Sequence, residues 1–413
     1  MGKGHINYVD VPHDLFDTDL YKLTMQQAVL KYFKDAKVEY RLYKRNYVGD
    51  AKLNSDKFIE QLKHEIREYA KHATFYKATL ARVRKKMPFL KDSYLDFISD
   101  FKLNHKDVII QKSNDVSNPP IIEVHGKWVD TILWEIPILF IISELYAKMF
   151  HKIKPYNSGG YNCIENKANA LLWSGCNFAD FGTRRRLGYY YHDRCVDKMK
   201  RKWEESGLLN GFMGTSNVMM AMYKYIPAVG TMAHEWIMGV AGKCDGGVAK
   251  ADKVAMVLWE KLYEGQLGIA LSDTYTVPLF LKNFTGRLSR LYDGVRHDSG
   301  DPKEFIDKMI MHYKRNNIDP MTKTIVFSDS ITTLKALELN HICKLKGIKC
   351  MFGIGGHFTN DPTTDGFTLD TVVKLHKIDG VRVCKLSDIR GKATGDEAVI
   401  KKTWEEVSCA LKP

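Results

Sequence analysis

Hydrophobic and polar positions repeat one pattern after about residue 155. A short apolar run ends in a cluster of Gly, Ser, Asp, Thr or Arg, and apolar residues at helical spacing usually follow. This alternation predicts short parallel strands connected by helices. Seven stretches show the pattern: 177–186, 211–217, 228–236, 268–274, 294–302, 324–330 and 350–356.

Polar clusters directly after the strands favour a barrel. In an α/β barrel the carboxyl ends of the strands meet at one face, and the active site is built there. We therefore predict a barrel domain over residues 156–369 in an α/β fold. A doubly wound open sheet is the alternative, although neither G-x-G-x-x-G after a first strand nor G-x-x-x-x-G-K-[ST] occurs.

The stretch 228–236 is the centre of the predicted site. It is expected to be a short buried strand that ends on small residues and brings His234 to the open end. A histidine with one neutral nitrogen can act as a base or accept a phosphoryl group. Glu235 either orients the imidazole or is solvated. The alternative for His234 is a core or capping residue whose nitrogens are satisfied by the backbone.

The residues before 155 predict a separate α+β domain, 1–155. The apolar run at 132–150 is interrupted by Glu135, Pro137 and Glu144, so it predicts a buried strand or helix and no membrane span. Residues 13–33 open with three aspartates and then show apolar residues at helical spacing from Leu20 to Phe33, which predicts a helix with Asp17 or Thr18 as N-cap. A strand over 37–43, helices over 55–110 and strands over 109–124 are expected to follow.

The end of the chain, residues 370–413, loses the strand-and-cluster pattern. Two short strands, 371–375 and 381–386, and a charged helix over 396–411 are expected there. We predict that this segment joins the 1–155 domain.

Composition limits the function classes. Hydrophobic residues make up 45% of the 413 positions and charged residues 27%, which excludes a disordered chain. The net charge is +13, but the basic residues are spread along the chain without a nucleic-acid-binding motif, so a small phosphate-rich substrate is favoured over nucleic acid. The eight cysteines lack C-x-x-C spacing and the first residues lack a signal-peptide core, which predicts a cytoplasmic protein, or also a nuclear one in a eukaryote.

Three of the clusters could bind phosphate or a flat ring. Phe181 stands beside Arg184, Arg185 and Arg186, and guanidinium groups bind phosphate with two hydrogen bonds. The 294–302 cluster carries Arg296 and Asp298, which could hold ribose hydroxyls or a phosphate. The glycines of 353–356 let backbone amides approach an anion. The simpler interpretations are a solvated basic turn and helix caps at 299–301 and 328–330. Spacing gives no metal ligand set.

Seven motifs in order resemble one family, nicotinate phosphoribosyltransferase. They are Asp17-Thr18-Asp19-Leu20-Tyr21-Lys22-Leu23-Thr24-Met25, Phe181-Gly182-Thr183-Arg184-Arg185-Arg186, Gly214-Thr215-Ser216-Asn217, Gly230-Thr231-Met232-Ala233-His234-Glu235-Trp236, Val295-Arg296-His297-Asp298-Ser299-Gly300-Asp301-Pro302, Phe327-Ser328-Asp329-Ser330 and Phe352-Gly353-Ile354-Gly355.

The resemblance implies a type II phosphoribosyltransferase fold, an incomplete α/β barrel with an α+β domain built from both chain ends. It implies transfer of phosphoribose from 5-phosphoribosyl 1-diphosphate (PRPP) to the ring nitrogen of nicotinate, giving nicotinate mononucleotide and diphosphate. Hydrolysis of ATP accompanies the reaction through a phosphohistidine, so the enzyme is of the ligase class and serves NAD biosynthesis by the Preiss–Handler route. Mg²⁺ is carried in with PRPP or ATP.

The same resemblance assigns the residues. His234 matches the phosphohistidine and acts in catalysis with Arg296 and Asp298. The implied substrate-binding residues are Tyr21, Phe181, Arg184, Thr215, Ser216, Ser328, Asp329, Gly355, Gly356, Arg45 and Lys385. Tyr21 and Phe181 stack on the pyridine ring, and Arg45 and Lys385 reach the diphosphate. A homodimer is implied, in which Tyr21 and Arg45 reach a neighbouring subunit's site.

Ser216 bears on the choice of base. The relatives that use nicotinamide carry an aspartate at this position, which would repel nicotinate, whereas a hydroxyl can donate a hydrogen bond to it. Two alternatives remain at this point: a nicotinamide or quinolinate phosphoribosyltransferase on a similar barrel, and a basic binding protein that has lost catalysis.

Overall fold

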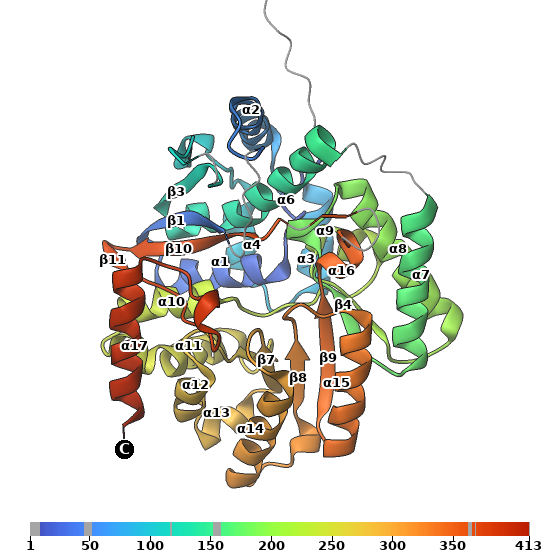
Figure 1. The fold of residues 1–413 in the computed structure, drawn as a ribbon, viewed down its shortest axis with the longest axis vertical. Helices are drawn as coiled ribbons and strands as arrows, with labels where there is room; N and C mark the ends of the chain where they lie inside the picture. The colour runs from blue at the N-terminus through green and yellow to red at the C-terminus, as the bar shows by residue number, and fades with distance from the viewer. Residues whose placement is uncertain are drawn as a thin grey trace, which may run out of the picture.

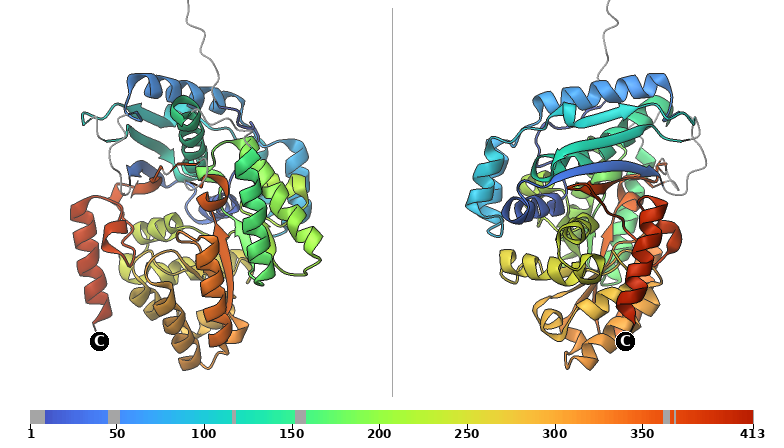
Figure 2. Two further views of the ribbon diagram at one scale, coloured as in Figure 1. Left: turned by 45° about the vertical axis from the view of Figure 1, so that its right-hand side comes forward. Right: turned by 90° about the vertical axis from the view of Figure 1, so that its left-hand side faces the viewer.

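The described strands form two sheets, which lie in different parts of the molecule (Figures 1 and 2). The computed structural model describes residues 9–44, 52–115, 118–151, 158–361, 366–367 and 369–412. One described sheet is parallel and the other antiparallel. The molecule is therefore an α/β sheet structure joined to an α+β layer, as the sequence predicts.

The parallel sheet has the order β5-β4-β9-β8-β7-β6. Its strands are β4 (Phe178–Asp180), β5 (Phe212–Thr215), β6 (Ile269–Leu271), β7 (Gly294–His297), β8 (Thr324–Phe327) and β9 (Lys349–Ile354). Each lies in one of the seven predicted stretches, and the polar cluster of each follows its carboxyl end. Most side chains of these strands are buried on both faces of the sheet, which explains why the strands are apolar along their length.

The prediction of a seventh strand over 228–236 is wrong. Ala228 makes only an isolated bridge to Thr215, and the backbone turns at Gly230, whose φ is +149°. His234 instead opens helix α10 (His234–Lys243). Thr231 Oγ1 donates to Ile269 O at 3.0 Å, so this segment contacts both outer strands of the sheet. The two edges therefore approach each other, as in an incomplete barrel.

The antiparallel sheet has the order β11-β10-β1-β3-β2. Its strands are β1 (Lys37–Lys44), β2 (Val108–Gln111), β3 (Ile121–Lys127), β10 (Thr371–Ile378) and β11 (Val381–Arg382). Strand β10, from the end of the chain, pairs along β1, with Val38 opposite Ile378 and Lys44 opposite Thr371. The end of the chain thus lies in the N-terminal sheet, while the domain boundaries at 155 and 370 stay a prediction.

The helices of the N-terminal part mostly follow the predicted pattern. They are α1 (Leu20–Tyr32), α2 (Asp56–His72), α3 (Lys77–Lys86), α4 (Asp92–Ser99), α5 (Trp128–Thr131) and α6 (Glu135–Tyr146). Helix α6 is buried at every position and packs on α2 and β10, so the interrupted apolar run is a core helix. Among the described residues no helix is both long and apolar enough to cross a bilayer.

The predicted N-cap of the first helix is wrong. Helix α1 begins one residue later, after Asp19, and no side chain caps it. Asp17 is fully buried and accepts two hydrogen bonds from Arg186, at 2.8 and 2.7 Å, and one from Asn217 at 2.7 Å. A buried carboxylate needs such donors, and this requirement prevails over capping.

The remaining helices connect and cover the parallel strands. They are α7 (Ser158–Trp173), α8 (Tyr189–Ser206), α9 (Val218–Lys224), α11 (Gly247–Tyr263), α12 (Val277–Asn283), α13 (Gly286–Leu291), α14 (Pro302–Arg315), α15 (Thr333–Lys346), α16 (Gly356–Thr359) and α17 (Glu397–Leu411). Helix α17 returns from the antiparallel sheet to pack on α11 and α12, at the left edge of the molecule in Figure 1.

A buried ionic cluster joins the two sheets next to His234. The Glu235 carboxylate accepts hydrogen bonds from Lys22 Nζ at 2.5 Å, Tyr40 OH at 2.6 Å and Trp128 Nε1 at 2.7 Å. Lys22 Nζ also pairs with Glu135 at 2.6 Å. Glu235 therefore neither orients the His234 ring nor lies in solvent, and both expectations for it are wrong. It ties the first turn of α10 to the N-terminal part.

Replacing Glu235 by Ala should destabilise the protein strongly. The Lys22 ammonium and two further donors would lose a buried acceptor, a change that typically costs about 3–5 kcal/mol. The expected result is a clear fall in the urea midpoint, followed by circular dichroism. Glu338→Ala is the control, because Glu338 forms an ion pair with Lys303 in which both side chains are more than half exposed. An equal shift in both variants would contradict the assigned role.

Candidate active site

One cavity of about 590 Å³ lies at the carboxyl ends of the parallel strands. All but two of the site residues predicted from the sequence line it: Tyr21, Phe181, Arg184, Ser216, His234, Arg296, Asp298, Ser328, Asp329, Gly355, Gly356 and Lys385. Thr215 does not line it, and Arg45 lies outside the described residues. Stretches more than three hundred residues apart thus meet in one hollow.

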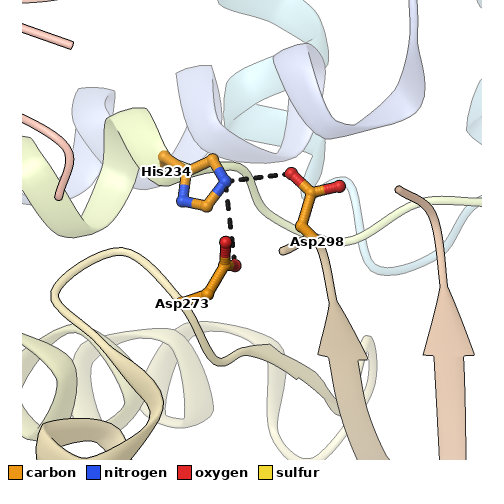
Figure 3. A group of neighbouring side chains, drawn as sticks. All are labelled: His234, Asp273 and Asp298. Atoms are coloured by element: carbon orange, nitrogen blue, oxygen red, sulfur yellow. Dashed lines mark hydrogen bonds and ion pairs between the residues drawn. The ribbon is translucent and has the colours of Figure 1, made fainter. Parts of the chain in front are cut away.

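His234 lies at the centre of a polar cluster formed by three segments (Figure 3). Its Nδ1 lies 2.9 Å from Thr274 Oγ1. Its Nε2 lies 3.0 Å from Asp298 Oδ2, 2.8 Å from Lys385 Nζ and 3.9 Å from Asp273 Oδ1. Figure 3 shows the two carboxylates reaching the same nitrogen from the loop after β6 and from the end of β7. Nε2 is therefore the ring nitrogen that faces both the two carboxylates and the ammonium group.

The surroundings keep His234 neutral. Burial, and next the Lys385 ammonium, lower the pKa of the imidazole to about 3, although Asp273 and Asp298 act in the opposite direction. Burial opposes ionisation of Asp298, but Arg296 and the hydrogen bond with His234 hold the pKa of Asp298 well below its usual value. A neutral imidazole beside ionised carboxylates can offer a lone pair as a base or nucleophile.

Asp298 connects His234 to Arg296. Arg296 lies 3.4 Å from Asp298 Oδ2 through one terminal nitrogen and donates to Met232 O at 3.2 Å through the other. Ser328 Oγ donates to Asp298 Oδ1 at 2.7 Å. Both carboxylate oxygens therefore have polar partners from within the chain, which fixes the side chain between β7 and β8.

The aromatic end of the cavity is built by Phe181, Tyr21 and Arg184. A Cβ at Gly353 would lie 2.4 Å from the Phe181 ring, so glycine is required for the ring to lie on β9. Arg184 lies 3.8 Å from Glu135 Oε1, too far for a hydrogen bond, so its charge is balanced while its donors face the cavity. This end suits a flat ring that carries an anionic substituent.

Tyr21 lies in the cavity of its own chain. Its hydroxyl is buried without a partner, and neighbouring Glu135 and Asp19 add to the effect of burial in raising the pKa of the phenol. The expectation that Tyr21 reaches into a neighbouring subunit's site is therefore not met in this structure. Helix α1 packs against the barrel, which holds the ring at the chain's own site.

The hydroxyl of Ser216 has a partner that the sequence did not suggest. Ser216 Oγ donates to Asp19 Oδ1 at 2.6 Å, and both side chains are buried at the edge of the cavity. Burial raises the pKa of Asp19, while Ser216 and Arg184 act in the opposite direction. Thr215 Oγ1 donates to Asp180 Oδ2 at 2.6 Å, which explains why Thr215 faces away from the cavity.

The opposite end of the cavity suits an anion. A Cβ at Gly356 would meet nothing within 4 Å, so a ligand can approach this backbone closely. His357 is held beside it, with Nδ1 3.2 Å from Asp361 and Nε2 accepting from Thr333 N at 3.2 Å. Lys392 Nζ donates to Asp329 Oδ2 at 2.7 Å. Small glycines, fixed donors and a lysine are the components of a phosphate site.

Comparisons with known proteins agree with this geometry. The model of the "Nicotinate phosphoribosyltransferase (NAPRTase) family" matches residues 176–408, and the model of that family's N-terminal domain matches residues 16–143. The chain belongs to the nicotinate phosphoribosyltransferase family. A nicotinate phosphoribosyltransferase of Methanococcoides burtonii is 39% identical over 402 residues, 94% of this chain and 95% of that one.

Other members of the family agree in sequence and in fold. A probable nicotinate phosphoribosyltransferase of Schizosaccharomyces pombe is 35% identical over 94% of this chain and 96% of its own length. The crystal structure of nicotinate phosphoribosyltransferase from Porphyromonas gingivalis has a TM-score of 0.88 at 34% identity and covers 96% of this chain and 100% of that one. A putative nicotinate phosphoribosyltransferase from Saccharomyces cerevisiae also reaches 0.88, at 32% identity, with 99% of each chain covered.

Sequence reasoning missed several residues of this family member's site. Asp273 and Thr274 stand in one of the predicted clusters, and their position directly after β6 was the available signal. Asp19 and Lys392 line the cavity, and Glu135 lies 3.8 Å from Arg184; no local pattern indicated these positions.

The grouping of His234, Asp273 and Asp298 also resembles a metal site. One ligand atom from each lies within 4.8 Å of the others. However, Lys385 Nζ lies 2.8 Å from the imidazole and 3.2 Å from Asp273. The ammonium already neutralises the cluster and stands against the same atoms. With the ammonium in place, these residues do not fit a resident cation.

Replacing Lys385 by Met should raise the pKa of His234. Without the ammonium, Asp273 and Asp298 alone face the ring and favour the imidazolium. In the native protein the pKa of about 3 lies below the unfolded value near 6.5, so this group's contribution to stability is present above pH 6.5 and is lost as the pH falls.

The measurement is a nuclear magnetic resonance pH titration of ¹⁵N-histidine-labelled protein. His234→Gln assigns the signal, and Lys346→Met, a surface lysine paired with Asp307, is the control. We expect the native His234 signal to stay neutral down to pH 5 and the Lys385→Met signal to titrate at higher pH. A native midpoint near 6.5 would contradict the described electrostatics.

Proposed function

We propose that this protein transfers phosphoribose from PRPP to the ring nitrogen of nicotinate, giving nicotinate mononucleotide and diphosphate. The reaction is coupled to ATP hydrolysis through phosphorylation of His234, and it serves NAD biosynthesis by the Preiss–Handler route. The observation that carries the proposal is that one cavity of a family member joins an aromatic pair, a cavity-facing arginine, a neutral histidine and a glycine loop.

Nicotinate fits the aromatic end of the cavity. The pyridine ring lies between Tyr21 and Phe181, and the Arg184 guanidinium binds its carboxylate. Ser216 acts differently from the sequence expectation, because its single proton is donated to Asp19. It can accept a hydrogen bond from a substrate but donate one only after leaving Asp19. Arg184 is therefore the main determinant of an acidic substituent over an amide.

The phosphoribosyl group fits the other end. Ser328 and Asp329 face the ribose, and the Gly355–Gly356 backbone faces the 5-phosphate. The nicotinate nitrogen forms a bond to the anomeric carbon as the bond to diphosphate breaks, through an oxocarbenium-like state. Arg296 and Lys385 supply positive charge to the leaving diphosphate. Lys385 is buried at His234, so its effect on diphosphate acts from that fixed position.

ATP phosphorylates His234 in the same proposal. In the tautomer that carries its proton on Nδ1, beside Thr274 Oγ1, the Nε2 lone pair attacks the γ-phosphorus, and the bond between that phosphorus and the β–γ bridging oxygen breaks to release ADP. Asp273 and Asp298 would repel the new phosphoryl group. Lys385, whose Nζ lies 2.8 Å from His234 Nε2, would attract it. Arg296 and Ser328 would then remain as the polar partners of the Asp298 carboxylate. Phosphorylation thus redistributes the partners of residues that also face PRPP.

Mg²⁺ belongs to the substrates in this proposal. The cation arrives bound to PRPP or ATP and supplies charge neutralisation to the phosphates when bound. Lys385 occupies the one described His/Asp cluster, so this chain's residues position the phosphates around an ion that the substrate carries. A cytoplasmic homodimer is part of the same proposal, and the mass of the native protein in solution tests it.

Purified protein should make nicotinate mononucleotide from nicotinate, PRPP and Mg²⁺, at a higher rate or to a higher yield when ATP is present. Chromatography of the products, with ADP measured in parallel, is the test. Nicotinamide and quinolinate are the competing bases, and we expect at least tenfold lower kcat/KM for nicotinamide, because loss of the Arg184 ion pair costs about 1.5–3 kcal/mol. Preference for either competitor would replace the proposed substrate.

Replacing His234 by Ala should abolish ATP coupling. No phosphoryl acceptor would remain at this position, so ADP release and its stimulation of synthesis should disappear. Mononucleotide formation without ATP should persist at a reduced rate, because the base and ribose contacts remain. Acid-labile ³²P incorporation from γ-labelled ATP measures the modified residue directly. Full ³²P incorporation in His234→Ala would exclude this residue as the acceptor.

A further inference from the structure

The chain returns from the antiparallel sheet to the barrel through a closed loop. Lys385 N donates to Thr394 O at 3.0 Å, and Thr394 N donates to Lys385 O at 2.9 Å. Residues 385–394 therefore form a loop with joined ends, called the C-terminal loop here. Lys385, Gly391 and Lys392 of this loop line the cavity, and the two halves of the loop make different contacts.

The first half is fixed to the loop after β6. Leu386 N donates to Thr274 O at 2.9 Å, and Asp388 Oδ1 accepts from Val277 N at 3.0 Å. Between these contacts Thr276 has a φ of +87°, which a β-branched residue rarely adopts. Strain of this kind persists only where the surroundings impose it. This half of the C-terminal loop is thus a rigid anchor, and it holds the residues that contact His234.

The second half ends at one side-chain contact in the cavity. Lys392 Nζ donates to Asp329 Oδ2 at 2.7 Å, and about one fifth to one quarter of each side chain is exposed (24% and 19%). Ser330 Oγ lies 3.2 Å from Asp329 Oδ1. Both oxygens of Asp329 therefore have donors from the chain itself. A ribose hydroxyl that binds Asp329 therefore shares the carboxylate with these donors or replaces one of them.

This pair stands where the proposed substrate binds. The proposed function places ribose hydroxyls at Asp329, and hydroxyls must donate to a carboxylate. If they replace Lys392, its ammonium is left in a partly buried cavity without its counter-ion, which is costly. The same substrate brings phosphate groups into this cavity. A lysine has a flexible four-carbon stem and can change partners without movement of the anchored backbone.

We propose that Lys392 is a substrate-binding residue that exchanges partners: its ammonium leaves Asp329 when the ribose hydroxyls bind there, and it then contacts a phosphate group of the phosphoribosyl substrate. This inference rests on the proposed function. It distinguishes Lys392 from Lys385, which is buried at His234 and stays with the catalytic cluster. The contact with Asp329 keeps the site electrically balanced before substrate arrives.

Direct binding tests the exchange without the reaction. Ribose 5-phosphate and inorganic diphosphate are titrated separately into the full chain by calorimetry. Lys392→Gln removes the charge, Lys392→Arg retains it, and Lys303→Gln is the control, since Lys303 lies on the outer face of α14 in an exposed pair with Glu338. We expect Lys392→Gln to weaken one of the two ligands about tenfold or more, the value of a charge-assisted hydrogen bond.

The ligand that is weakened identifies the phosphate. Loss of ribose 5-phosphate affinity places Lys392 at the 5-phosphate, and loss of diphosphate affinity places it at the leaving group. In steady state the KM for PRPP should rise by the same factor, with the KM for nicotinate unchanged, and Lys392→Arg should recover most of the loss. Lys303→Gln should match the native protein.

Two results would overturn the inference. Unchanged affinity for both ligands in Lys392→Gln would leave Lys392 as a structural partner of Asp329 only. Tighter binding would make it a competitor of the substrate. Failure of the proposed function has a different signature, because the native protein would then form no mononucleotide from any pyridine base while the two titrations still report on Lys392.

Discussion

The structure depends on how one buried carboxylate is satisfied. Glu235 stands in the first turn of α10 and accepts three hydrogen bonds, all from the N-terminal part of the chain. A buried charge is tolerated only with such partners, so the position of α10 relative to the antiparallel sheet is fixed. Because His234 is the preceding residue, the same constraint fixes the imidazole at the cavity. The contact between the two parts of the chain thus also places this ring.

Local patterns predicted most of the elements. Short apolar runs before polar clusters identified β4 to β9. A parallel strand that is buried on both faces is apolar along its length, and the polar cluster marks where the strand ends and the connection to the next helix begins. The pattern failed at 228–236, which has the same composition. There the backbone turns at Gly230, Val229 N donates to Thr215 O, and Thr231 Oγ1 donates to Ile269 O. Whether such an apolar run pairs as a strand depends on whether the two edges of the sheet leave room for it. The local sequence pattern carries no information about the distance between those edges.

The candidate site was predictable where the strand ends carry it. Arg296 lies in β7, and Asp298, Ser328 and Phe181 each directly follow a strand, so topology alone brings them together. The contributions of the first forty residues and of the C-terminal loop were not predictable by position, since they reach the cavity by long-range packing. The interpretation of Glu235 was wrong for this reason: adjacent residues on a helix point in different directions, and neighbours in sequence serve different environments.

Charge balance in the cavity explains why its residues act together. Burial raises the electrostatic cost of an unpaired charge. Asp298 in the cavity accordingly has Arg296 and Lys385 within reach, and Glu135, next to the cavity, has Lys22 and Arg184. Burial opposes ionisation of Glu135, yet these cations lower the pKa of its carboxyl to about 2. An anionic substrate or a new phosphoryl group adds negative charge to the cavity. It therefore competes with the carboxylates for these cations. The residues with two partners available, Arg296 and Lys385, are therefore those through which events at the histidine and at the phosphates influence each other.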